Sequence, residues 1–153
     1  MTQAEVANLD GKVAIVTGAG AGLGRAEALA LARGGAAVVV GDVSPAAEEV
    51  VAQIRSDGGR AELVLGDSGD RETADALMAA ADGLGGLHIV VNNAGFCRDK
   101  MIFSMTDDEF DSVVRVHLRG HFLLSRNASA YWRDAAKGSG GEVYGRVINT
   151  SSA

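Results

Sequence analysis

The sequence is poor in cysteine and in aromatic residues. Cys97 is the only cysteine among 153 residues, so no disulfide can form within the chain. Aromatic residues make up 5% of the chain, whereas glycine occurs 21 times and hydrophobic residues reach 47%. These proportions match an ordinary globular domain rather than a disordered or fibrous chain. A core of small and aliphatic side chains packed closely against backbone suits an α/β fold.

The chain also lacks an excess of positive charge and a long apolar run. Its formal net charge is −6 and its pI is about 5.0, which argues against a broad surface for nucleic acid or anionic lipid. No apolar stretch approaches the roughly 20 residues that a membrane-spanning helix needs. The first ten residues include two acids and lack the apolar segment of a signal peptide. We therefore expect a cytoplasmic protein that acts on a small molecule.

Short apolar runs rich in β-branched residues alternate with stretches rich in alanine and leucine. This alternation predicts βαβ units and a parallel sheet that is covered on both faces. The expected strands are residues 13–16, 37–40, 63–65, 87–91 and 147–149. Four crossover helices between these strands predict an α/β, doubly wound parallel sheet, a Rossmann fold with strand order 3-2-1-4-5.

Turn and capping residues predict where the helices begin and end. The first helix is expected to end at Gly34, and the second to have Ser44 as its N-cap and Pro45 as its first residue. Thr106 and Glu109 have the spacing of a capping box, which predicts the start of a long helix. The apolar positions of that helix are Phe110, Val113, Val114, Leu118 and Leu124.

A glycine-rich segment joins the first expected strand to the first helix, and it contains Gly18, Gly20, Gly22, Leu23 and Gly24. Gly18 permits a tight turn, Gly22 lets backbone approach a pyrophosphate, and Gly24 lets the helix pack closely on the sheet. Free N–H groups at the start of the helix would face the anion. The spacing is Gly-x-x-x-Gly-x-Gly rather than Gly-x-Gly-x-x-Gly, and a purely structural turn is the alternative interpretation.

Asp42 lies 18 residues after Gly24, at the end of the second expected strand. At this separation an acidic side chain can accept hydrogen bonds from the adenosine ribose of a dinucleotide. A 2′-phosphate would meet its negative charge, and no basic residue stands at Ala21 or Val43. We therefore predict NAD as the cofactor, with NADP less favoured. The alternative is that Asp42 only ends the strand.

Four motifs in order resemble those of the short-chain dehydrogenase/reductase family. They are the glycine segment, Asp67 after the third strand, Asn92-Asn93-Ala94-Gly95 after the fourth, and Asn149-Thr150-Ser151-Ser152 after the fifth. The resemblance runs from about residue 10 to residue 153. It implies that Asp67 contacts the adenine and that Asn93, Ala94 and Gly95 form a wall of the cofactor site. Turn formation is the alternative role of the Asn-Asn-Ala-Gly segment.

The resemblance also implies two catalytic residues. Ser152 matches the family's serine, which positions the substrate's carbonyl oxygen; Ser151, or simple capping of the strand end, is the alternative. His117 stands where the family commonly carries an asparagine of a proton relay. The sequence around it resembles the branch with the 3-hydroxyacyl-CoA dehydrogenase units of multifunctional β-oxidation enzymes. Imidazole can join such a relay because it offers a donor and an acceptor and titrates near neutral pH.

A metal site is not predicted. His117 and His121 have the spacing of the two ligands in His-Glu-x-x-His, but Leu118 replaces the glutamate and no motif indicates a third ligand.

The family's Tyr-x-x-x-Lys pair, which handles the substrate proton, is missing from residues 1–153. Tyr131 and Tyr144 are followed four residues later by Ala135 and Ile148. We therefore interpret 1–153 as a single NAD(P)-binding Rossmann domain, truncated after strand five, that is inactive alone. The resemblance implies an oxidoreductase for a small alcohol or ketone, such as a hydroxyacyl thioester or hydroxysteroid, that forms a homo-oligomer when full length. The rival interpretation is a non-catalytic dinucleotide-binding or regulatory fragment.

Overall fold

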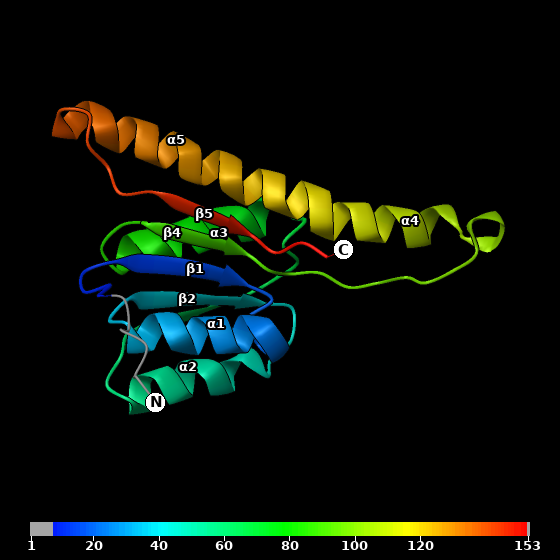
Figure 1. The fold of residues 1–153 in the computed structure, drawn as a ribbon, viewed down its shortest axis with the longest axis horizontal. Helices are drawn as coiled ribbons and strands as arrows, with labels where there is room; N and C mark the ends of the chain where they lie inside the picture. The colour runs from blue at the N-terminus through cyan, green and yellow to red at the C-terminus, as the bar shows by residue number, and fades with distance from the viewer. Residues whose placement is uncertain (1–7, 153) are drawn as a thin grey trace.

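The computed structural model describes residues 8–152 and contains a five-stranded parallel sheet (Figure 1). The strands are β1 (Val13–Thr17), β2 (Ala37–Asp42), β3 (Ala61–Leu65), β4 (Ile89–Asn92) and β5 (Arg146–Asn149). Their order across the sheet is β3-β2-β1-β4-β5, which confirms the predicted order. In the centre, Ile15 pairs with Val39 on one side and with Val90 on the other. The expected strands are correct to within two residues at each end.

Helices cover both faces of the sheet (Figure 1). Alternate strand residues such as Val16 and Val38 pack against α1 (Gly22–Arg33) and α2 (Ala47–Ser56). The intervening residues, such as Ile15 and Val39, pack against α3 (Arg71–Gly83) and α5 (His121–Ser139). Because successive side chains of a strand point to opposite faces, this arrangement gives two separate apolar cores. It explains why β1 and β2 are nearly continuous apolar runs.

The long helix predicted after Thr106 is continuous but changes its winding. It comprises α4 (Asp107–Val114), a π-helical turn η2 (Arg115–Gly120) and α5, and a short 3₁₀ turn η1 (Ile102–Ser104) precedes it. The predicted capping box is present, because Thr106 and Glu109 each accept a hydrogen bond from the other's backbone N–H. A hydrogen bond from Lys100, together with the capping-box bond, lowers the pKa of Glu109 to about 2.

Two local expectations are wrong. The second helix begins at Ala47 rather than Pro45, because Ser44 accepts the Ala46 N–H within a turn that precedes the helix. On the long helix, Leu124 is buried but Phe110 is 58% and Leu118 67% exposed, although both were expected on its apolar face. In Figure 1, α4 extends beyond the sheet, and none of its residues is buried. Across the described part of the chain, no helix is both long and apolar enough to cross a membrane.

Candidate functional site

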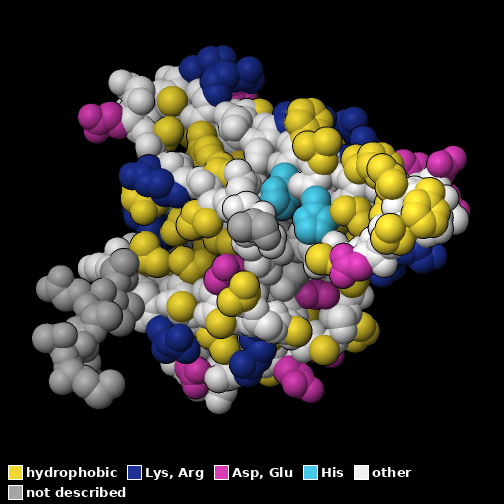
Figure 2. All heavy atoms as spheres, turned by 45° about the vertical axis from the view of Figure 1, so that its right-hand side comes forward, with side chains coloured by type: hydrophobic (Ala, Val, Ile, Leu, Met, Phe, Trp, Pro, Cys, Tyr) yellow, Lys and Arg dark blue, Asp and Glu magenta, His cyan; other side chains and the backbone are white. Residues whose placement is uncertain are grey.

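A cavity of about 720 Å³ lies at the carboxyl ends of the central strands. It is lined by nine of the residues predicted for the site, namely Gly18, Gly22, Leu23, Asp42, Asp67, Asn93, Ala94, Gly95 and His117. Gly20, Gly24 and Ser152 do not line it. Figure 2 looks onto this end of the molecule, where histidine side chains lie near the middle of the face and hydrophobic ones gather on the part that projects to the right. The topology therefore brings together motifs that are far apart in the sequence, because parallel strands end at the same edge.

The glycine loop begins the cavity wall. Gly18 has a φ of +62°, and a Cβ there would lie 2.8 Å from the Cα of Ala94. A Cβ on Gly24 would collide with the Gly18 carbonyl oxygen and the Asn93 amide. Gly22 differs, since its φ is +54° but a Cβ would meet nothing within 4 Å. Gly18 and Gly24 thus permit close packing, whereas Gly22 presents bare backbone to open space. The close packing at Gly24 was expected from the sequence, and the approach of a pyrophosphate to Gly22 stays a prediction.

The first turn of α1 presents free backbone donors to the cavity. Its N-cap residue is Ala21, which has no side chain to accept a hydrogen bond from them. No acidic side chain occupies the first turn. Uncapped N–H groups together with the positive end of the helix dipole favour an anion such as phosphate.

Asp42 is held by two backbone donors. Gly20 N–H donates to its Oδ2 at 2.8 Å, and Ser44 N–H donates to its Oδ1 at 2.8 Å. Each carboxylate oxygen has a second lone pair, so both can still accept from a ligand hydroxyl. A Cβ on Gly20 would lie 2.9 Å from Oδ2. Gly20 therefore positions Asp42 rather than lining the cavity itself.

Thr17 joins the glycine loop to the wall made by Asn93 and Ala94, a role that was not expected from the sequence. Its buried hydroxyl accepts the Asn93 N–H at 3.1 Å and the Ala94 N–H at 3.0 Å. The Asn93 side chain donates to the Gly18 carbonyl at 3.4 Å and accepts from Thr150 at 3.2 Å. Thr17 directly precedes Gly18 at the end of β1, and this position in the sequence was the only indication of its role in the site.

Asp67 also lines the cavity and is paired with Arg115. Arg115 Nε donates to Asp67 Oδ2 at 3.1 Å, and its Nη2 contacts Asp70. Gly69 N–H donates to Asp67 Oδ1 at 2.7 Å. The hydrogen bond to Asp67 raises the pKa of the Arg115 guanidinium. Sequence reasoning missed Arg115, because its partner lies 48 residues away.

His117 contacts the backbone that follows β4. Its Nε2 is 3.0 Å from Phe96 N and 2.8 Å from Phe96 O, and its ring packs so closely on Gly95 that a Cβ there would collide with it. Burial, and secondarily the charge of His117, lowers the pKa of the neighbouring His121. Within residues 8–152 no group of three His, Cys, Asp or Glu side chains is placed to hold a metal ion.

Ser152 is exposed beyond the end of β5. The chain is anchored just before it, because Thr150 N–H donates to the Asn92 carbonyl at 3.1 Å and Asn92 donates to Asn149 at 3.0 Å. The roles of Ser152 and His117 in catalysis stay predictions.

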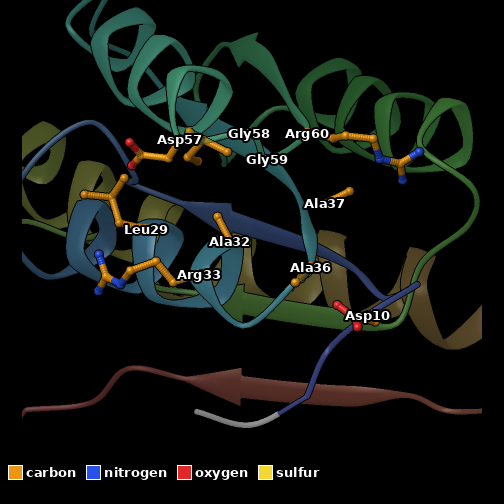
Figure 3. Close-up of a pocket in the computed structure, with 12 residues that line it drawn as sticks. Asp10, Leu29, Ala32, Arg33, Ala36, Ala37, Asp57, Gly58, Gly59 and Arg60 are labelled. Carbon is orange, nitrogen blue, oxygen red and sulfur yellow. The ribbon is translucent and has the colours of Figure 1, made fainter. Parts of the chain in front are cut away.

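A second cavity, of about 470 Å³, lies at the other end of the sheet (Figure 3). Its lining includes Arg33 at the end of α1, Asp57 at the end of α2, and Arg60 before β3. Two helix carboxyl ends meet there, and their dipoles disfavour an anion. The cavity at the carboxyl ends of the strands is therefore the better candidate for a phosphate-bearing ligand.

Comparison with known proteins decides the family, because the family model described as short chain dehydrogenase matches residues 12–153. The chain belongs to the short-chain dehydrogenase family. It is 60% identical over 152 residues to the hydroxyacyl-CoA dehydrogenase ChsB1 of Mycobacterium tuberculosis, covering 95% of this chain and 48% of that protein. It is 43% identical to the peroxisomal multifunctional enzyme type 2 of Mus musculus, covering 94% of this chain and 20% of that protein.

A solved structure agrees with this short-chain dehydrogenase assignment. The crystal structure of a short chain dehydrogenase from Mycobacterium avium superposes with a TM-score of 0.88 at 46% identity, covering 95% of this chain and 54% of that one. The chain thus spans about half the length of ChsB1 and of this dehydrogenase. The likeness confirms the Rossmann fold predicted from the sequence.

Proposed function

We propose that the protein carrying this chain is an NAD-dependent oxidoreductase that moves a hydride between the nicotinamide ring and the carbon of an alcohol or ketone. The observation that carries the proposal is the cavity in which the free N-terminus of α1 and the Asp42 carboxylate lie together. The bare backbone at Gly22 fits a pyrophosphate, and Asp42 fits a ribose. The bound dinucleotide would supply the hydride donor or acceptor.

NAD is preferred over NADP because of the charge beside the ribose position. Both Asp42 oxygens are fixed by backbone N–H groups, so the carboxylate cannot easily turn away from a 2′-phosphate. Neighbouring Val43 is exposed and apolar and offers no compensating cation. Two like charges about 4 Å apart near a protein surface repel by about 4 kcal/mol.

The cofactor proposal is tested by titrating NADH and NADPH into the protein and following nicotinamide fluorescence. NADH is expected to bind at least tenfold more tightly, and Asp42→Ala is expected to remove most of that preference. Asp57→Ala, in the cavity at the other end of the sheet, is the matched control and should leave it unchanged. Equal affinities in the unchanged protein, or a preference that survives Asp42→Ala, would show that Asp42 does not read the ribose.

Ser152 and His117 are proposed to assist the chemistry. Ser152 would donate a hydrogen bond to the substrate oxygen, and His117 would pass a proton through water by its Nδ1, since Phe96 backbone engages Nε2. A serine hydroxyl does not ionise near neutral pH, so Ser152 cannot serve as the general acid or base. Further residues must supply that group.

Residues 1–153 alone are therefore expected not to turn over substrate. NADH consumption with ketones and acyl-CoA thioesters can be compared between this chain and the same chain fused to the carboxyl-terminal half of ChsB1. The fusion is expected to be active and the short chain inactive, with His117→Ala lowering the rate of the fusion and releasing no metal. Comparable rates would require a proton donor within residues 1–153. Stoichiometric zinc in the protein would contradict the role proposed for His117.

The substrate class follows from the resemblance around His117 and from the name of ChsB1, which is a hydroxyacyl-CoA dehydrogenase. We propose a hydroxyacyl thioester, with a hydroxysteroid as the other class. A homo-oligomer formed through the long helix is part of this proposal. The cytoplasmic location stays a prediction, and the mouse relative is named as a peroxisomal enzyme.

A non-catalytic dinucleotide-binding module is the second candidate, because the two tyrosines have structural surroundings. Tyr131 packs against the core between the sheet and α3 and α5. Tyr144 contacts the cations Lys12 and Arg146, which are 4.6 and 4.4 Å from its ring centroid. Neither tyrosine lines the candidate cavity. An inactive fusion that still binds NADH would favour this candidate.

A further inference from the structure

The π-helical turn η2 holds the loop that carries Asp67. Arg119 donates to the Gly69 carbonyl at 3.0 Å, and Gly120 packs closely on Ser68, since a Cβ there would lie 3.1 Å from the Ser68 carbonyl oxygen. The stem of Arg115 covers Gly69, where a Cβ would collide with its Cγ. The hydrogen bonds of a π-helix join residues five apart, so residues four and five apart lie near the same side, and Arg115, Arg119 and Gly120 all contact the loop. One wide turn therefore fixes residues 67–70 against the long helix.

We propose that Arg115 is a positioning residue for recognition of the adenine amino group, which it achieves by holding the carboxylate of Asp67 in place. This inference rests on the proposed function, because it takes the ligand of the cavity to be an adenine dinucleotide. Asp67 lines the cavity, and Arg115 binds it from outside, since Arg115 itself is not part of the lining. Arg115 acts through Asp67 and does not touch the ligand.

The hydrogen bonds around Asp67 leave it able to do this. Its Oδ1 accepts from Gly69 and its Oδ2 from Arg115, and each oxygen of a carboxylate can accept a second hydrogen bond. An ionised carboxylate only accepts, so it selects a donor such as the amino group of adenine and rejects a carbonyl oxygen at the same place.

Charge balance explains why an arginine is needed. Asp67 and Asp70 are three residues apart and both contact the Arg115 guanidinium. Without Arg115, the two negative charges would repel and Asp67 would lose the donor that fixes its Oδ2. The planar fork of arginine can bind both carboxylates at once, which the ammonium of lysine cannot do with the same geometry.

The ion pair of Arg115 and Asp67 is too exposed to contribute much to the stability of the fold. The Arg115 and Asp67 side chains are 42% and 37% exposed, and ion pairs at such positions contribute little to folding. Removal of Arg115 should therefore change ligand discrimination much more than the melting temperature.

The test compares binding of NADH with binding of reduced nicotinamide hypoxanthine dinucleotide, which carries a carbonyl oxygen in place of the adenine amino group. The unchanged protein should bind NADH about tenfold more tightly, the size expected for one hydrogen bond to a charged group. Arg115→Met should bind NADH about as weakly as the analogue, with its melting temperature nearly unchanged. Arg115→Lys should keep part of the discrimination, and it retains the stem that packs on Gly69 if the methionine variant folds poorly.

Arg133→Met is the matched control, because Arg133 pairs with Asp134 on the outer part of α5, away from the cavity lining. It should bind both dinucleotides as the unchanged protein does. If Arg115→Met and Arg115→Lys still bound NADH about tenfold more tightly than the hypoxanthine analogue, the inference would be overturned. Equal binding of both dinucleotides by the unchanged protein would overturn it too. Either result would leave the proposed function intact. If the unchanged protein bound neither dinucleotide, the proposed function would fail and the inference with it.

Discussion

The centre of the sheet and its β5 edge have the same backbone pairing but opposite surroundings. All five residues of β1 are buried, whereas all four residues of β5 are exposed. β5 nevertheless continues the parallel ladder of β4 in regular register, from the pair of Ile89 and Arg146 to that of Asn92 and Asn149. Hydrogen bonds thus hold β5 in place although its residues are exposed, while apolar burial, which stabilises the fold, is concentrated at the centre.

Substitution of two isoleucines by alanine tests this comparison, and it has the largest expected effect on the free energy of unfolding. Ile15 in β1 is fully buried, whereas Ile148 in β5 is 51% exposed. Ile15→Ala should lower the free energy of unfolding by about 3 kcal/mol, because it leaves a cavity between the sheet and helices α3 and α5. Ile148→Ala should cost less than about 1 kcal/mol. Urea denaturation measures both. A large cost at Ile148 would break the comparison and mean that another segment or chain packs over β5 in the protein.

A pair of glycines in the helices extends the comparison of packed and open positions, since the same substitution should have opposite effects on stability at the two sites. Gly24→Ala in α1 forces a methyl group into the Gly18 carbonyl and should destabilise by about 1–3 kcal/mol while weakening NADH binding. Gly138 lies near the end of α5, where a Cβ would meet no atom within 4 Å. Gly138→Ala should stabilise by about 0.5–1 kcal/mol. Thermal unfolding of both variants gives the signs, and destabilisation of equal size would contradict the argument.

His88 directly precedes β4, which lies between the central strand β1 and the edge strand β5. Its substitution should have the smallest effect on stability. Its Nδ1 accepts the Val13 N–H at 3.0 Å, and its carbonyl accepts the Arg146 N–H of β5. Burial, followed by the charge of Lys12, lowers the pKa of His88 below its ordinary value of 6.5. The unfolded chain therefore binds the proton more readily than the folded one. The contribution of neutral His88 to stability is present above pH 6.5 and is lost as the pH falls through 6.5 toward the folded pKa.

His88→Gln should flatten this pH dependence, because the glutamine oxygen can accept the Val13 N–H without titrating. The measurement is the midpoint of urea unfolding between pH 8 and pH 5. The lowered pKa of His121 acts in the same direction, so a residual slope is expected in the variant. An unchanged slope in His88→Gln would show that protonation of His88 does not cause the pH dependence of stability.

Local patterns predicted most of the fold. Runs such as 37–40 predict strands because consecutive β-branched residues are typical of a sheet that is covered on both faces. Thr106 and Glu109 predict a helix start because a capping box needs only two residues that are three positions apart. The glycine roles were also predictable, since φ and steric space at Gly18 and Gly24 follow from the strand–turn–helix context.

Features that depend on distant partners could not be predicted in this way. The π turn has no sequence periodicity of its own, and the Arg115–Asp67 pair joins residues that only the fold brings together. The exposure of Phe110 depends on how far α4 extends past the sheet rather than on helical spacing. The start of α2 differed because Ser44 can accept a hydrogen bond from either a turn or a helix.

The strand order determines when each strand can find its partner as the chain is synthesised. Growth of the sheet proceeds outward from β1 through β2 to β3 and then returns to the other edge of β1, where Ala14 pairs with Ile89. The contact between Val13 and His88 spans 75 residues, so it forms late in folding and is reached only after α3 has left the ribosome. Until then one edge of β1, made of Val13–Thr17, has no partner strand. An unpaired apolar edge can pair with another chain, so β1, the central strand of the finished sheet, is open to such pairing during translation.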